Sequence, residues 1–110
     1  MINVSDLNEL LIANNCLHFM SMQFDENTMA YDLSLLIAAS EEAWTDAVRI
    51  SFIDVSQFTS RDFGGGLTQL MHMNVSKLDS GLDRIRYQFC DHEDGRLSFC
   101  FSSFSVDYVV

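Results

Sequence analysis

The 110-residue chain has 16 Asp and Glu residues against six Lys and Arg, which gives a formal net charge of −10 at neutral pH. This length suits one domain over residues 1–110. A hydrophobic content of 48% can build a packed core, which excludes a disordered chain. The negative charge disfavours nucleic acids and anionic membranes as partners and favours a basic protein.

The first predicted element is a helix. Three leucines follow the i, i+3, i+4 spacing of a helical face, and they are Leu7, Leu10 and Leu11. Asp6 is the predicted cap of the first turn, and Asn14 with Asn15 ends the helix.

Apolar and polar residues alternate after residue 16, as expected for strands with one buried face. The predicted apolar faces are Met20, Met22 and Phe24; Tyr31, Leu33, Leu35 and Ile37; Val48, Ile50 and Phe52; Leu67, Met71, Met73 and Val75; Ile85, Tyr87 and Phe89; Leu97, Phe99 and Phe101; and Phe104, Val106, Tyr108 and Val110. Turns are expected at 25–28, 64–66 and 80–81, and the third strand is expected to fray over 54–58. We therefore predict a mainly β (α+β) fold: an antiparallel sheet of six to eight strands, as a sandwich or half-open barrel, with one N-terminal helix.

The register of the last hairpin follows from whether its apolar residues have odd or even numbers. Its apolar residues all have odd numbers, so directly opposed residues must have numbers with an even sum. This predicts a three-residue loop, 93–95, with Gly95 in the left-handed conformation. Cys90 then lies opposite Ser98, and Cys100 opposite Gln88. The apolar parity changes after Phe101, which predicts a bulge or bend at 102–103.

No pattern of reactive residues indicates an enzyme. Cys16 and His18 lie two apart on a predicted strand, but nothing else resembles a cysteine hydrolase, so a buried Cys and a strand His are expected. Cys90, His92 and Cys100 match no structural zinc spacing. We predict no catalytic residue, no metal and no cofactor, with all three cysteines reduced.

The first 15 residues lack the cations and the apolar run of a signal peptide. No apolar run approaches the ~18–20 residues of a membrane span. The odd number of cysteines fits no disulfide scaffold. The expectation is a cytoplasmic protein.

Two segments resemble a known group of proteins. The run Tyr-Gln-Phe-Cys-Asp-His-Glu-Asp-Gly-Arg-Leu-Ser-Phe-Cys-Phe at 87–101 is similar to the late hairpin of small acidic bacterial immunity proteins of polymorphic toxin systems, including contact-dependent growth inhibition. The segment 48–58 resembles their central strand. The resemblance implies a protein that binds one toxin domain, often a nuclease with a cationic cleft, and blocks it.

The acids are unevenly placed, since residues 1–48 contain eight acids and no Lys or Arg. Loop acids that project from a sheet are the expected partner contacts, with Trp44 as a hot spot or, equally, a core anchor. The predicted partner-binding residues are Asp25, Glu26, Glu41, Glu42, Trp44, Asp46, Glu93 and Asp94. Two alternatives remain open: another acidic binding module, such as a secretion chaperone or nucleic-acid mimic, and a small enzyme or ligand-binding protein.

Overall fold

The computed structural model describes residues 3–40, 42, 47–61, 68–69, 73–79, 81, 85–91 and 95–108. Its helix α1 spans Val4–Ala13 and is capped by Asn3, whose side-chain oxygen accepts a hydrogen bond from the Asp6 backbone N–H at 2.8 Å. The expected cap, Asp6, instead lies in the first turn, where a carboxylate also favours the helix dipole. The earlier start has a physical reason, because Val4 packs against the core ahead of the buried leucines. Within the described residues, no helix is long and apolar enough to cross a membrane.

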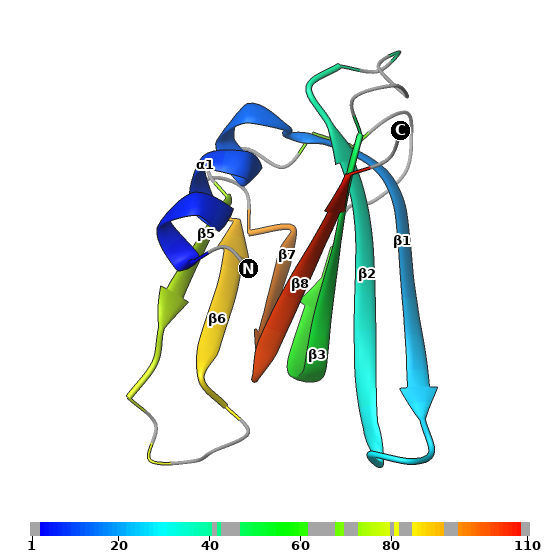
Figure 1. Cartoon of the computed structure of the whole chain (residues 1–110), viewed down its shortest axis with the longest axis vertical. Helices are drawn as coiled ribbons and strands as arrows, with labels where there is room; N and C mark the ends of the chain where they lie inside the picture. Colours follow the sequence, from blue (N-terminus) through cyan, green and yellow to red (C-terminus); the bar gives the residue numbers. More distant parts are fainter. Residues whose placement is uncertain are drawn as a thin grey trace.

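In the described part of the chain, eight strands form one antiparallel sheet that is not closed into a barrel, in agreement with the predicted class (Figure 1). Seven strands follow the order β4-β1-β2-β3-β7-β6-β5, and β8 pairs with β3. The strands are β1 (Cys16–Asp25), β2 (Ala30–Ala38), β3 (Val48–Ser60), β4 (Thr68–Gln69), β5 (Met73–Lys77), β6 (Tyr87–Asp91), β7 (Leu97–Phe101) and β8 (Ser103–Tyr108).

Strand β3 joins the two halves of this sheet. Its first part pairs with β2 and β8, and its last part pairs with β7. Asp54 and Gln57 have left-handed backbone angles, φ 60° and 52°, at the register shifts within the β2–β3 and β3–β7 pairings respectively. The expected fraying over 54–58 is therefore wrong. The strand continues to Ser60, and the two left-handed residues bend it from one half of the sheet into the other.

The fourth predicted strand is also corrected. Thr68–Gln69 pairs with β1, whereas Met73–Lys77 pairs with β6 at the opposite end of the sheet order. One alternating pattern therefore covers two strands on different edges. Leu67 and Met71, two of the residues expected on its apolar face, lie outside the described residues.

The register predicted for the last hairpin is confirmed. Cys90 pairs with Ser98 and Gln88 with Cys100, and Gly95 has φ 61°. The expected bend also occurs, because β7 ends at Phe101 and Ser102 separates it from β8. The Ser102 backbone N–H and hydroxyl both donate to the Ile53 carbonyl, which fixes this corner against β3.

Both halves of the sheet contribute to one core. Phe52 from β3 packs against three phenylalanines of β6 and β7, with ring centroids 4.8 Å from Phe101, 4.9 Å from Phe99 and 5.8 Å from Phe89. All four are fully buried. The helix closes this core through Leu7 and Leu11, and α1 lies beside β5 in Figure 1.

Candidate functional site

The structure describes three of the predicted partner contacts. Asp25 and Glu26 lie at the end of the β1–β2 hairpin, half-buried and exposed respectively, and Glu42 is exposed. Glu42 follows the other end of β2, a strand of nine residues, so roughly 30 Å of strand separates it from the hairpin turn. The described acids therefore do not form one patch. The remaining predicted contacts lie outside the described residues, and they are Glu41, Trp44, Asp46, Glu93 and Asp94.

Exposed apolar side chains gather at the same hairpin end. Phe24 is paired with Tyr31 across the two strands, and their rings meet edge to face with centroids 5.2 Å apart. We call the four exposed apolar residues here the tip cluster; they are Met22, Phe24, Met29 and Tyr31, with exposed fractions of 40%, 41%, 69% and 49%. Exposed apolar side chains gathered in one place on a small domain make this a candidate interaction site.

The tip cluster is exposed because the core ends before the hairpin does. Met22 pairs with the buried Leu33, so the cluster continues the core face of the sheet. The pairing of β2 with β3 ends at Tyr31, opposite Val55, where β3 bends, and the turn lies beyond it. In Figure 1 the end of the hairpin extends past the bend of β3.

The turn at the tip holds a strained residue. The Asp25 carboxylate accepts a hydrogen bond from the Asn27 backbone N–H at 2.9 Å, which orders the start of the turn. Met29, the last turn residue, has φ 56°, a conformation that costs a residue with a side chain roughly 1–2 kcal/mol. Glycine or asparagine is usual at such a position. An exposed Met in this conformation makes the turn a candidate functional segment.

Replacing Met29 with glycine is expected to stabilise the protein by about 0.5–1 kcal/mol, because relief of the strain exceeds the added freedom of the unfolded chain. Chemical denaturation measures this free energy of unfolding. Met29→Ala is the matched control, since it removes the same side chain and keeps the strained backbone. A gain that is equal in both variants would show that the left-handed angle is not the cause.

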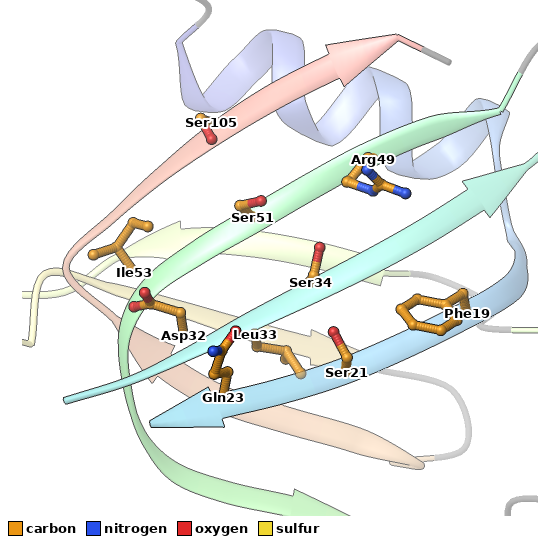
Figure 2. A pocket seen from close by; sticks show the side chains of 10 residues that line it. All are labelled: Phe19, Ser21, Gln23, Asp32, Leu33, Ser34, Arg49, Ser51, Ile53 and Ser105. Carbon is orange, nitrogen blue, oxygen red and sulfur yellow. The ribbon is translucent and has the colours of Figure 1, made fainter. Parts of the chain in front are cut away.

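The opposite face of the hairpin is polar and hollowed. Four serines oppose one another in register across β1, β2, β3 and β8: Ser21, Ser34, Ser51 and Ser105. Figure 2 shows them in a row across the four strands, and their small side chains leave a depression of about 540 Å³. Phe19 and Arg49 border one side of this row, and Gln23 and Asp32 the other.

The serine row offers hydroxyls for hydrogen bonding rather than an activated nucleophile. A serine nucleophile needs an adjacent base. Among the ten residues that line the depression there is no histidine or lysine, and Asp32 carries the one carboxylate. The Asp32 carboxylate accepts a hydrogen bond from the Asp54 backbone N–H at 3.2 Å, which anchors it at the bulge of β3.

A catalytic thiol–imidazole pair of Cys16 and His18 requires an unbroken strand, on which residues two apart share a face. The pairing of β1 with β2 shifts between Leu17 and Phe19, which leaves His18 in a bulge. Its Nε2 lies 2.9 Å from the Ser40 carbonyl oxygen, and the Cys16 thiol lies 3.6 Å from the Asn15 side-chain oxygen. Within the described part of the chain, no three His, Cys, Asp or Glu residues are arranged to hold a metal ion. His92 lies outside that part.

None of the three cysteines is joined to another in a disulfide, and burial raises the pKa of the Cys100 thiol above its ordinary value of 9.0. The folded state therefore keeps a proton that the unfolded chain releases. The stability contributed by this group is present below pH 9 and is lost as pH rises through the raised pKa of the folded state. We expect the free energy of unfolding to fall less steeply above pH 9 in Cys100→Ala than in the parent protein. Equal slopes in denaturant titrations across that range would contradict this assignment.

Sequence reasoning missed both the tip cluster and the serine row. The cluster was hidden because Met22 and Phe24 have the pattern of a core face, and the sequence does not show where β3 bends away from them. Comparisons with protein-family models, curated proteins and solved structures found no match to this chain.

Proposed function

We propose that this chain is a bacterial immunity protein that binds a basic toxin domain in the cytoplasm and blocks its active site. The observation that supports this best is the composition of the β1–β2 hairpin end. Exposed apolar side chains lie there beside Asp25 and Glu26. Residues 16–38, which form the hairpin, contain no Lys or Arg.

Both the apolar and the acidic side chains of the hairpin end have a role in the proposed binding. Apolar and aromatic side chains at the centre of an interface supply most of its affinity. Acidic side chains around them steer a cationic partner, with association rates up to ~10⁸–10⁹ M⁻¹s⁻¹ at low salt. A nuclease needs cations to hold phosphates, so an acidic projection fits its cleft. A nucleic-acid mimic would present carboxylates in place of exposed Met and Phe.

The experiment uses the protein encoded by the adjacent gene, taking its most basic domain as the probe. We expect the purified full chain to bind this domain, to suppress its toxicity when co-expressed, and to associate more slowly as salt rises. If the domain is basic and toxic but neither binds the chain nor is inhibited by it, the immunity proposal is wrong. Binding with an association rate independent of salt would remove the electrostatic part.

A further inference from the structure

The two edge strands of the sheet, β5 and β1, differ in what covers their outer edges. At the β5 end, the Asn8 side chain of α1 donates to the Val75 carbonyl at 3.0 Å and accepts from the Val75 N–H at 2.7 Å. It therefore occupies the place of a neighbouring strand. At the other end, β1 pairs with β4 through Cys16 and Leu17 alone. Within the described residues, no strand lies along the outer edge of 19–25.

This open edge has little of the usual protection, and Asp25 at its end is the one charged residue of 19–25. Edge strands are commonly short, or carry lysine, proline or a bulge that prevents pairing with another chain. The seven residues 19–25 read Phe-Met-Ser-Met-Gln-Phe-Asp, without Lys or Pro, and the bulge of β1 comes before them at His18. Apolar side chains are exposed on both faces of the edge, Phe19 on the serine side and Met22 with Phe24 on the core side.

We propose that residues 19–25 accept an extended segment of the basic partner as an added strand of the sheet. Backbone hydrogen bonds along β1 would hold the segment, and its alternate side chains would contact Phe19 on one face and Phe24 on the other. This inference rests on the proposed function and specifies how the partner binds.

The negative charge of the chain determines which segment fits the open edge of β1. A second copy of this chain could pair with the same edge, but it would bring a further net charge of −10. The hairpin already carries Asp25, Glu26 and Asp32 without a compensating Lys or Arg. A strand that alternates apolar residues with Lys or Arg complements both the backbone edge and this charge.

The other long edge of the same half-sheet provides an internal control. Strand β8 pairs with β3. Its residues on the face of the serine row are Ser103, Ser105 and Asp107, and all three are exposed. Tyr108 is its large exposed side chain, at 64%. The substitutions Phe24→Ser on β1 and Tyr108→Ser on β8 therefore each remove one exposed aromatic ring from an edge strand.

The test uses the full chain labelled for NMR and an eight-residue peptide of alternating valine and lysine. Successive N–H groups of a strand point to opposite edges, so an added strand protects every second amide of 19–25. We expect the peptide to slow hydrogen exchange at those alternate amides by at least about tenfold. Phe24→Ser should abolish this protection, and Tyr108→Ser should preserve it. A valine–glutamate peptide of equal length should have no effect.

Three results would overturn strand addition. The first is no protection at peptide concentrations up to about 1 mM, the range of weak complexes. The second is a change spread over all acidic segments without alternation, which is attraction of charge alone. The third is alternate protection in the free protein that grows with its own concentration, which makes a second copy the occupant. If the toxin domain binds without protecting alternate amides of 19–25, strand addition is wrong and the proposed function stands. If the peptide protects those amides but no toxin domain binds the chain, the immunity proposal is wrong and the edge is still one that accepts a basic strand.

Discussion

Replacement of Phe52 by alanine is expected to lower the free energy of unfolding by about 3–5 kcal/mol, the cost of deleting a fully buried ring and leaving a cavity. Phe52 lies on the strand shared by both halves of the sheet, and its ring contacts phenylalanines of β6 and β7 within 5.8 Å. A domain of this size has about 5–15 kcal/mol of stability in total. The variant should therefore be close to unfolding at 37 °C.

Ile12→Ala is the matched control for this effect. Ile12 is 73% exposed on α1, so its truncation should change the free energy of unfolding by less than about 0.5 kcal/mol. Urea denaturation followed by circular dichroism measures both variants. If Phe52→Ala lost less than about 1 kcal/mol, the two halves of the sheet would not share the core described above.

Replacement of Phe24 by alanine is expected to weaken binding of the basic partner by about 2 kcal/mol or more, roughly a thirtyfold rise in Kd. The ring of Phe24 stacks edge to face on Tyr31 at the centre of the tip cluster. A half-exposed ring contributes less to folding than a buried one, so the thermal unfolding midpoint should fall by only a few degrees.

Tyr108→Ala separates this effect from a general loss of exposed aromatic surface. Tyr108 is exposed on β8, on the other edge of the same half-sheet, and its truncation should leave Kd within about twofold. Calorimetric titration of the basic domain into each variant gives the comparison. Equal weakening by the two substitutions would place the interface elsewhere.

The sequence predicts the parts of the structure that depend only on residues close together in the chain. The strand register of the last hairpin was predicted correctly because the parity of its apolar positions and Gly95 fix it locally. Glu93 and Asp94 of the predicted loop lie outside the described residues. The leucine face of α1 was also found, although its cap was placed at Asp6. The sequence shows Asn3 as a cap only when Val4 is counted as part of the apolar face.

Long-range pairing could not be predicted in the same way. The serine row requires the registers of three strand pairs at once, and two of these contain bulges, at His18 and near Asp54. The separation of β4 from β5 depends on which distant strand each one meets. The tip cluster looks like core until the position of the bend in β3 is known. For the acids around Trp44 and for Glu93 and Asp94, partner contact stays a prediction.

The most direct measurement of the central claim, that the hairpin end contacts the partner, is methionine oxidation by peroxide with and without the basic domain. Met22 and Met29 are exposed, and the buried Met73 serves as the internal standard. We predict that Met22 and Met29 oxidise to sulfoxide readily in the free protein and at least about tenfold more slowly in the complex. Met73 should be slow in both. Unchanged oxidation of Met22 and Met29 in a saturated complex would contradict the claim.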